Sequence, residues 1–332
     1  MSDWVVGKNL GFSYDGAVKP REDVALILEK QGYKSLDIPQ FGEGDLSALE
    51  QIQAGESVIW QYPTYTNQPN YDLNVAKKVH AAKGFAIAIV HDVDCLRGFG
   101  GELEDAVKVL NEFDWLILLT DKLGQVLTEA GLTTRWIVRQ PWDYLIDQET
   151  PVTFSYKINY AGNLTKGKTA FLNDIEIPDG VSFKLYGENS DRREFKPSLN
   201  YAGAVQPKKL PEVLTDGFGL IWDGMLDETK HHSTDENKSY WGDYAKLTWP
   251  YKLSLYFAAG LPVLATKDSN AGRLIQDLKI GFVGDTLDEL MEQVKNCTPE
   301  QYHEFQDNLK PLTHNVTNGA GIRMSIYRIA MI

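Results

Sequence analysis

The stretch WPYKLSLYFAAGLPVLAT, residues 249–266, predicts a helix, a stop and a strand in direct succession. Pro250 suits the first turn of the helix, where its missing N–H would have no partner within the helix. Gly260 suits a left-handed cap at the end of the helix, and Pro262 prevents the helix from continuing. The apolar residues 261–266 then have the length of a buried strand.

The same alternation of strands and helices runs along most of the chain. Short apolar runs predict strands at 4–10, 57–63, 85–92, 115–121, 134–140, 154–163, 182–189, 218–224, 261–266 and 280–285. Apolar residues at helical spacing predict helices at 21–32, 71–84, 101–113, 122–131, 208–217, 250–260, 271–279 and 287–296. Such an alternation indicates an α/β fold with parallel sheets covered by helices on both faces.

The domain organisation follows from a break in this pattern. The chain has 332 residues, too many for one ordinary core, and the alternation stops around QPWDYLIDQETP, residues 140–151, before it restarts. We therefore expect two Rossmann-like, doubly wound domains, residues 1–148 and 149–332, that face each other across a cleft. Open α/β sheets bind ligands at their carboxyl edges, so the cleft is the expected site. The apolar segment 321–332 is expected to form a helix that packs across the domains or in a subunit interface.

The composition excludes several classes of function. The chain carries 33 lysines and arginines against 46 acids, a net charge of −13, which argues against a nucleic-acid or anionic-membrane surface. Two cysteines form no disulfide framework and fit a reducing compartment. We find no signal peptide and no apolar run long enough to cross a membrane. The expectation is a cytoplasmic protein without a transmembrane segment.

Three lysines suggest a site for an anion. Lys252 lies at the start of a helix whose amino end is already positive, and Lys246 precedes it by one short loop. This placement makes sense for a ligand with more than one negative charge, such as a diphosphate. In NYAGNLTKGK, residues 159–168, Gly162 allows close approach to the backbone and Lys166 offers a point charge for phosphate. Each lysine could equally be a solvated residue in a surface turn.

The segment IVHDVDCL, residues 89–96, carries the candidate catalytic residues. His91 and Asp92 end an apolar strand, where a carboxylate can act as a general base and a neighbouring histidine can hold or share the proton. The alternative is an aspartate that caps the next helix. Asp94 completes a D-x-D pair, but it lies beyond the expected strand end and a metal needs more ligands, so no metal is expected.

The loop QYPTYTNQPNYD, residues 61–72, is a candidate acceptor site. Thr64, Tyr65 and Asn67 follow a strand and could present hydroxyls and an amide to a sugar-like acceptor, although an ordinary polar loop fits the sequence as well. Other motifs are absent. The N-terminal loop 9–20 lacks the dinucleotide pattern G-x-G-x-x-G, and the chain contains neither a P-loop nor G-x-S-x-G.

Taken together, these segments resemble the GT-B-fold glycosyltransferases. The resemblance covers nearly the whole chain and is strongest to the bacterial glucosyltransferases that extend the first N-acetylglucosamine (GlcNAc) on serine-rich repeat adhesins. Related sequences are described as galactofuranosyltransferases of polysaccharide synthesis. The segments that carry it are YAGNLTKG, PYKLSLYFAAGLPVLA, QYPTY, VHDVDCL, DGFGLIWDG and YAKLTWPYKL.

The resemblance implies a UDP-sugar donor held by the second domain and an acceptor held by the first. The donor-binding residues that it implies are Gly16, Ala17, Asn163, Lys166, Tyr186, Tyr244, Lys246, Thr248 and Lys252. Among them, Lys166 would meet the diphosphate and Tyr186 would lie near the uracil or ribose. Leu255 stands where many GT-B enzymes carry a glutamate that holds the ribose hydroxyls, so ribose recognition would have to come from other residues.

The implied mechanism is an inverting transfer without a metal cofactor. The lysines and the helix amino end would stabilise the leaving diphosphate, while Asp92, helped by His91, would deprotonate the acceptor hydroxyl. The expected reaction moves glucose or GlcNAc to a GlcNAc-modified adhesin or glycan, and the expected assembly is a homo-oligomer. The alternatives are a galactofuranosyl- or other hexosyltransferase of polysaccharide synthesis, and a non-catalytic partner subunit that binds the UDP-sugar.

Overall fold

The computed structural model describes residues 3–7, 17–139, 141–223 and 240–332, with the backbone alone for 240–242. These residues form two compact units. The first comprises residues 3–7, 17–143 and 319–332, and the second comprises residues 144–318. The chain therefore returns to the first unit after completing the second, and each unit is described by itself.

The first unit is built on a parallel sheet of six strands in the order β2-β1-β4-β6-β7-β8. Their bounds are β1 Trp4–Val6, β2 Lys34–Leu36, β4 Ser57–Tyr62, β6 Phe85–Val90, β7 Trp115–Leu118 and β8 Arg135–Val138. The strand order reverses between β1 and β4, which makes this the topological switch point of the unit. The apolar runs that predicted β1, β4, β6 and β7 are almost wholly buried, as expected for a sheet covered on both faces. The edge strands β2 and β8 are more exposed, and the sequence analysis did not predict β2.

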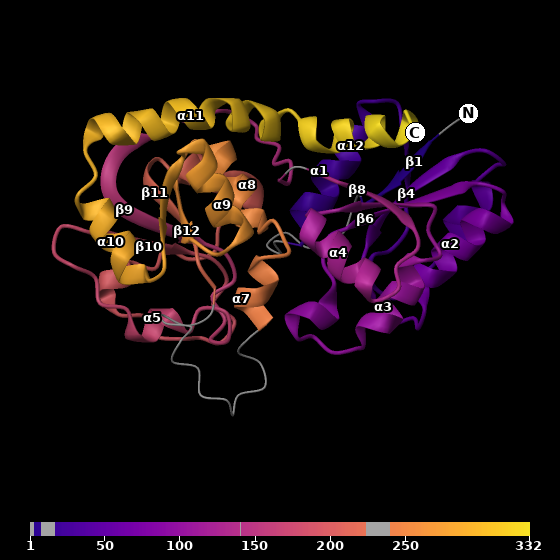
Figure 1. Cartoon of the computed structure of the whole chain (residues 1–332), viewed down its shortest axis with the longest axis horizontal. Coiled ribbons are helices and arrows are strands. Elements are labelled where there is room, and N and C mark those ends of the chain that lie inside the picture. The colour runs from indigo at the N-terminus through magenta and orange to yellow at the C-terminus, as the bar shows by residue number, and fades with distance from the viewer. Residues whose placement is uncertain (1–2, 8–16, 140, 224–239) are drawn as a thin grey trace. The chain divides into compact units, whose positions relative to one another are not determined.

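The connections of the first unit are mainly helices (Figure 1). They are α1 Val18–Glu29, α2 Tyr71–Ala81, α3 Leu103–Leu110, α4 Asp121–Glu129 and α12 Ala320–Ala330, with 3-10 helices η1 Ser47–Gln51 and η2 Asp94–Arg97. A separate two-stranded parallel sheet joins β3 Phe41–Gly42 to β5 Tyr65–Thr66.

Helix α12 confirms the helix expected near residues 321–332, and its amino end is held by a buried carboxylate. Asp143 accepts hydrogen bonds from the backbone N–H groups of Gly321 and Ile322, each at 2.9 Å, and pairs with Arg139 at 3.0 Å. A negative charge at this end suits the free N–H groups of a helix. In Figure 1 the helix lies beside α1, which it contacts together with β8.

The second unit contains a parallel sheet of five strands in the order β10-β9-β11-β12-β13. Their bounds are β9 Thr153–Ala161, β10 Ser182–Tyr186, β11 Asp216–Ile221, β12 Val263–Thr266 and β13 Gly281–Gly284. Its α-helices are α5 Phe171–Asp174, α6 Leu210–Val213, α7 Tyr240–Ala245, α8 Tyr251–Ala259, α9 Asn270–Leu278, α10 Leu287–Lys295 and α11 Pro299–Thr317, with 3-10 helices η3 Pro197–Leu199 and η4 Pro207–Lys209.

Two apolar clusters form the core of the second unit. Leu220 and Leu264 belong to one cluster, while their strand neighbours Ile221 and Val263 belong to the other. Because side chains alternate along a strand, the clusters cover opposite faces of the sheet. This is the doubly wound arrangement that the sequence predicts. The strand order reverses between β9 and β11, so their carboxyl ends mark the switch point of this unit.

The stretch 249–266 forms the predicted helix, stop and strand. Gly260 has a left-handed φ of 75° and ends α8, and β12 follows directly. Pro250 lies one position earlier than predicted, because it is the N-cap of α8 in an extended conformation and Lys252 is the second helical residue.

Candidate functional site

The residue that anchors α8 in the second unit is Tyr256. Its buried hydroxyl accepts a hydrogen bond from the Ala161 N–H at 3.0 Å and lies 3.1 Å from the Leu220 carbonyl oxygen, to which it can donate. Gly219 makes room for the ring, because a Cβ there would lie 2.2 Å from Tyr256 Cγ. Lys252 is four residues earlier and therefore on the same face of α8. The K-L-x-x-Y spacing thus carries Lys252 to the carboxyl ends of β9 and β11.

Lys252, Asp223 and Tyr160 form a closed set of hydrogen bonds at this edge. Lys252 Nζ donates to Asp223 Oδ1 at 2.7 Å and to Tyr160 Oη at 3.0 Å, and Tyr160 Oη donates to Asp223 Oδ1 at 3.0 Å. Lys168 Nζ lies 3.9 Å from the other oxygen of Asp223. We call these four residues the donor-side cluster. Two lysines and one carboxylate give it a net charge of +1.

Burial controls the ionisation of the donor-side cluster. The side chain of Lys252 is only 8% exposed. Burial lowers the pKa of Lys252 to about 8, and the nearby charge of Lys168 adds to this effect, whereas Asp223 opposes it. Burial acts to raise the pKa of Asp223, but the charges of Lys168 and Lys252, with the hydrogen bonds from Lys252 and Tyr160, hold it below its ordinary value. Lys252 and Asp223 are therefore both charged at neutral pH.

The other lysines of the predicted donor site do not contact this cluster. Lys246 pairs with Asp243 and Asp268, each at 3.3 Å, so much of its charge is balanced within the protein. The side chain of Lys166 is exposed, and its backbone N–H donates to Asp191 at 2.6 Å.

The uncharged residues of the predicted donor site have mainly structural contacts. Tyr186 is buried at the end of β10, and its hydroxyl donates to the Val213 carbonyl oxygen at 3.3 Å. Tyr244 is also buried. Asn163 accepts a hydrogen bond from the Thr165 N–H at 2.8 Å, and the carbonyl of Thr248 lies 3.5 Å from Asn270 Nδ2. In the first unit, Ala17 directly precedes α1, whereas Gly16 lies outside the described residues.

In the first unit, Asp92 follows β6 and pairs with an arginine that the sequence analysis did not single out. Arg97 Nη1 lies 3.0 Å from Asp92 Oδ2, and Arg97 Nη2 lies 2.7 Å from Asp94 Oδ1. The same guanidinium donates to the Tyr65 hydroxyl at 2.9 Å. We call Asp92, Asp94, Arg97 and Tyr65 the acceptor-side cluster. It contains two carboxylates and one cation.

His91 is bound to other partners than Asp92. Its Nε2 lies 2.9 Å from Gln61 Oε1, and its ring stacks on Trp142 with centroids 4.5 Å apart. Gln61 uses its amide N–H groups on the carbonyl oxygens of Val6 and Arg21, so its Oε1 must accept from His91. Nδ1 is then the nitrogen with the lone pair. Burial, with the charges of Arg21 and Arg139, holds the pKa of His91 well below its ordinary value, so the ring is neutral.

The remaining predicted acceptor residues, Thr64 and Asn67, differ in whether their side chains are held by hydrogen bonds or exposed. Thr64 donates its hydroxyl to Asp72 at 3.1 Å, and Asp72 also accepts from Trp60 at 2.7 Å. Asn67 is exposed, and its backbone N–H donates to the Gly42 carbonyl oxygen at 2.7 Å. Tyr65 and Asn67 are therefore the more accessible members of this loop.

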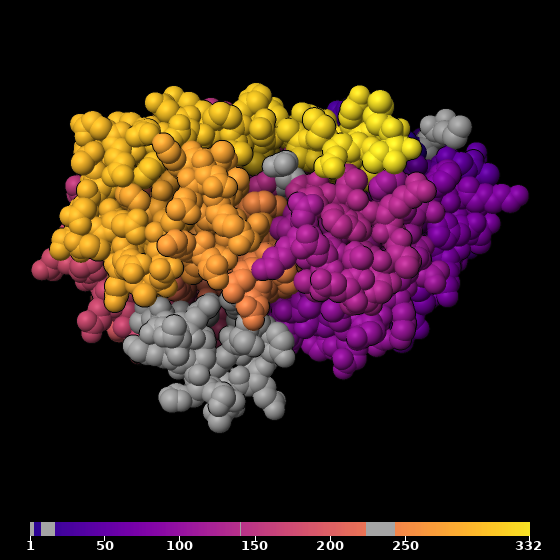
Figure 2. All heavy atoms as spheres, viewed as in Figure 1, coloured from indigo at the N-terminus to yellow at the C-terminus, as the bar shows by residue number. Residues whose placement is uncertain are grey.

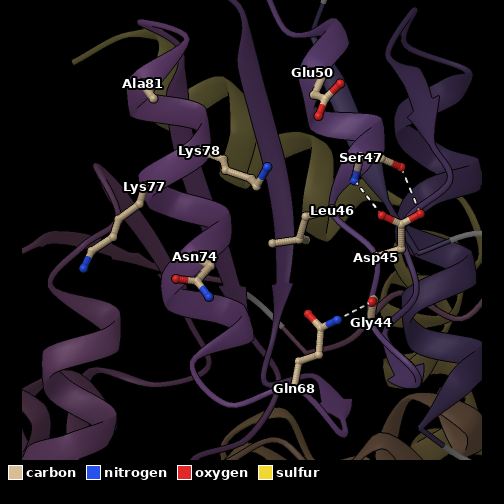
Figure 3. A pocket seen from close by; sticks show the side chains of 10 residues that line it. All are labelled: Gly44, Asp45, Leu46, Ser47, Glu50, Gln68, Asn74, Lys77, Lys78 and Ala81. Carbon is tan, nitrogen blue, oxygen red and sulfur yellow. Dashed lines mark hydrogen bonds between the residues drawn. The ribbon is translucent and has the colours of Figure 1, made fainter.

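A pocket of about 530 Å³, lined mostly by residues with polar side chains, adjoins the same loop (Figure 3). In Figure 3, Asn74, Lys77 and Lys78 project from α2 on one side, and Asp45, Ser47 and Glu50 lie on the side of η1. Asp45 is occupied by hydrogen bonds from Ser47, and Gln68 donates to the Gly44 carbonyl oxygen at 2.5 Å. Gln68 directly follows Asn67, so the pocket continues the surface of the loop.

Comparison with known proteins identifies the family. Residues 3–141 match the family model of the glucosyltransferase 3-like N-terminal domain, and residues 158–328 match that of the C-terminal domain. The chain belongs to the glucosyltransferase 3-like family. It is 30% identical to the beta-1,6-galactofuranosyltransferase WbbI of Escherichia coli K12, over 71% of this chain and 68% of that protein. It is 25% identical to Glucosyltransferase 3 of Streptococcus gordonii, over 91% of this chain and 90% of that protein. The protein is a glycosyltransferase, as its sequence suggests.

Solved structures place this family member in the GT-B fold class. The sucrose-phosphate synthase of Thermosynechococcus elongatus matches with a TM-score of 0.65 at 8% identity, covering 100% of this chain and 98% of that one. The lipopolysaccharide glycosyltransferase WaaG matches with a TM-score of 0.54 at 13% identity, covering 98% of both chains. TarM of S. aureus, solved with UDP, matches with a TM-score of 0.53 at 11% identity, covering 92% of this chain and 58% of that one.

Within the ranges given above, no group of three or more histidine, cysteine, aspartate or glutamate side chains is arranged to hold a metal ion. Among the same residues, no helix is long and apolar enough to span a bilayer.

Asp223, Tyr160, Lys168, Arg97 and Gln61 were missed as functional candidates. A signal existed for Asp223, because it follows the apolar run FGLIW as Asp92 follows the apolar run FAIAIV and His91. The roles of Tyr160 and Gln61 depend on contacts between strands and could not be read from local sequence.

Proposed function

We propose that this glycosyltransferase moves glucose or GlcNAc from a UDP-sugar to a GlcNAc-bearing acceptor, with inversion and without a metal cofactor. The observation that carries the proposal is the donor-side cluster. It places two lysines and the amino end of α8 at the switch point of the second sheet, where open α/β folds bind ligands. The presence of UDP in the TarM complex and the name of the Glucosyltransferase 3 relatives support the donor class.

The donor-side cluster would act on the leaving group. As the bond between the anomeric carbon and the diphosphate oxygen breaks, its electron pair leaves with the UDP and negative charge grows on that oxygen. Cations fixed in advance in a site with little water stabilise such charge strongly. Lys252 and Lys168 are the residues for this role, and Lys166, Lys246, Asn163, Tyr186, Tyr244, Thr248, Gly16 and Ala17 remain proposals for the rest of the donor site.

The acceptor-side cluster would supply the base. The acceptor oxygen forms the new bond to the anomeric carbon, and its proton passes to Asp92. Arg97 orients the carboxylate, since its guanidinium holds Asp92, Asp94 and Tyr65 together. His91 is neutral and bonded to Gln61, so its role in this proposal is to shape the site rather than to share the proton of Asp92.

For the acceptor, we propose the GlcNAc-modified serine-rich repeat adhesin that the family resemblance implies. Thr64, Tyr65 and Asn67 are the residues proposed to hold the reacting sugar, and the adjoining polar pocket would receive a more distant part of the acceptor. A galactofuranosyl transfer in polysaccharide synthesis is the second candidate, because WbbI is 30% identical over 71% of the chain.

We also propose that the enzyme acts in the cytoplasm as a homo-oligomer. Apolar side chains at α12 support the proposal of a homo-oligomer. Met324, Tyr327 and Met331 are 57%, 60% and 68% exposed, and the helix is uncovered on the face shown in Figure 2. Light scattering of the wild type and of Tyr327→Lys tests this, with a smaller particle expected for the variant.

The function is tested by incubating the protein with a panel of UDP-sugars and a GlcNAc-O-serine peptide, with and without EDTA, and weighing the peptide. One added hexose or N-acetylhexosamine that survives EDTA is the predicted result. UDP binding without any mass gain would favour another acceptor or the non-catalytic subunit, and a gain that EDTA abolishes would contradict the metal-free mechanism.

A further inference from the structure

Asp223 stands in an unexpected place for a carboxylate. It lies just past β11, within hydrogen-bond distance of the lysine proposed to meet a diphosphate. A negative charge beside Lys252 opposes the binding of a diphosphate, so the position of Asp223 calls for another explanation. We propose that Asp223 is a positioning residue, which fixes the ammonium group of Lys252 at the switch point and keeps it charged for the donor diphosphate. This inference rests on the proposed function.

The contacts of Lys252 fix the position of its ammonium group. Lysine has a flexible stem and three N–H donors. Asp223 and Tyr160 take two of these donors, at 2.7 and 3.0 Å, and the ammonium also lies 4.2 Å from the centroid of the Tyr160 ring. Among the described residues no partner takes the third donor. The pair therefore sets the position of the charge and leaves one N–H for a ligand.

Asp223 also affects the charge of Lys252. Lys252 has a side chain that is only 8% exposed, and such burial favours its neutral form. Lys168 adds a like charge, 3.9 Å from the other carboxylate oxygen of Asp223. The other titratable groups against Lys252 are the hydroxyls of Tyr160 on β9 and Tyr256 on α8, both kept neutral because burial raises their pKa values. Within the described part of the chain, Asp223 is the one group found to hold the proton on Lys252.

A positioning role for Asp223 and direct contact of Asp223 with the donor predict different effects of pH on binding. If Asp223 accepted a hydrogen bond from a donor hydroxyl, its replacement by asparagine would weaken binding equally at every pH. If it acts through Lys252, the replacement moves the pH at which Lys252 loses its proton, and the loss of binding depends on pH.

The experiment measures UDP affinity by calorimetry between pH 6 and 9. Wild-type affinity should hold up to about pH 8 and weaken above it. In Asp223→Asn the midpoint of this loss should move down by about one pH unit or more, so that UDP binding to the variant is near normal at pH 6 and about tenfold weaker at pH 8 than at pH 6. An equal loss at all pH values, or no loss, would overturn the proposal.

A surface pair in the same unit provides the matched control. Asp307 and Lys310 also lie 2.7 Å apart, but their side chains are 69% and 76% exposed. Asp307→Asn should leave the profile unchanged. If Asp223→Asn does not fold, Asp223→Glu takes its place. That variant keeps the charge, so its midpoint should stay at the wild-type pH while affinity falls, and a midpoint shifted to lower pH would contradict the proposal.

A second measurement, the titration of Lys252 in the absence of UDP, distinguishes failure of this inference from failure of the proposed function. In protein labelled with ¹³C at lysine Cε, the Lys252 signal is identified by its absence in Lys252→Arg and titrated without UDP. It should titrate at lower pH in Asp223→Asn than in the wild type, and equal titration would overturn the inference. Failure of the wild type to bind UDP at any pH would count against the proposed function alone.

Discussion

The acceptor-side and donor-side clusters occupy equivalent places in their units and carry opposite charges. Each follows the carboxyl ends of strands at or beside a switch point. In the first unit one arginine serves two aspartates, Asp92 and Asp94. In the second unit one aspartate, Asp223, pairs with two lysines, Lys252 and Lys168. The extra carboxylate of the acceptor-side cluster is suited to accept a proton. The extra ammonium group of the donor-side cluster is suited to bind a phosphate.

The clusters also differ in burial. The side chains of Asp92 and Arg97 are 28% and 19% exposed, whereas that of Lys252 is 8% exposed. A less exposed charge is less screened by water and salt, so changes at Lys252 should have electrostatic effects that persist at high salt. The two clusters can therefore be told apart by which step a substitution affects and by how that effect depends on pH.

The largest effect is expected at Asp92. Asp92→Asn should lower the transfer rate about 10²–10⁴-fold, the usual contribution of a general base, while UDP affinity stays the same. Single-turnover kinetics and calorimetry measure the two quantities. Asp105→Asn, in the exposed surface pair with Lys108, is the control and should behave as wild type. Wild-type transfer by Asp92→Asn would remove this residue from the role of base.

The next largest effect is expected at Lys252. Lys252→Met should lower the transfer rate about 10²–10³-fold, the range found when one preorganised donor to a developing negative charge is lost. Lys310→Met is the matched surface control. Steady-state kinetics with a saturating acceptor measure the effect. A rate within threefold of the wild type would mean that leaving-group stabilisation comes from other residues.

Lys252 should also make the stability of the folded chain depend on pH. Its pKa is about 8 in the folded chain and about 10.5 in the unfolded chain, so between these values the unfolded chain binds more protons. Stability therefore rises with pH across this window, and the wild type should gain about 2–3 kcal/mol relative to Lys252→Met from pH 8 to 10.5. Urea unfolding at these two pH values measures the gain. If the difference in unfolding free energy between the two proteins were the same at both pH values, the pKa of Lys252 would not be lowered in the folded chain.

The smallest effect is expected at Arg97. Arg97→Lys keeps the charge but loses the planar fork that holds Asp92, Asp94 and Tyr65. Because the pairs are partly exposed, the acceptor KM should rise only about three- to fivefold, with UDP affinity unchanged. Initial rates at varied acceptor concentration provide the test. A changed UDP affinity would contradict the division of labour between the clusters.

The sequence predicted the fold class and ten strands of the two main sheets, because their apolar runs are continuous. It did not predict β2, β3 and β5, which are only two or three residues long. It did not lead us to α11, although Tyr302, Phe305 and Leu309 are buried at helical spacing. Pro311 and many polar residues in that segment hide the pattern. Within a helix, proline removes only one backbone hydrogen bond, and a long helix with a packed face can tolerate that loss.

The candidate site was predicted in part. Pro250 and Gly260 delimit the helix in the sequence, and they located Lys252 correctly at the start of α8. The partner of Lys252 was not predicted, because Asp223 and Tyr160 come from two other strands and meet it only in the folded sheet. For the same reason the pairing of His91 with Gln61, rather than with Asp92, could not be read from the adjacent letters H and D.

The most direct test of the account compares UDP affinity in two variants that each remove one cation, Lys252→Met and Arg97→Gln, measured by calorimetry at pH 7. We expect Lys252→Met to weaken UDP binding about tenfold or more, and Arg97→Gln to stay within twofold of the wild type. Equal losses in both variants, or a loss confined to Arg97→Gln, would contradict the assignment of the diphosphate to the donor-side cluster.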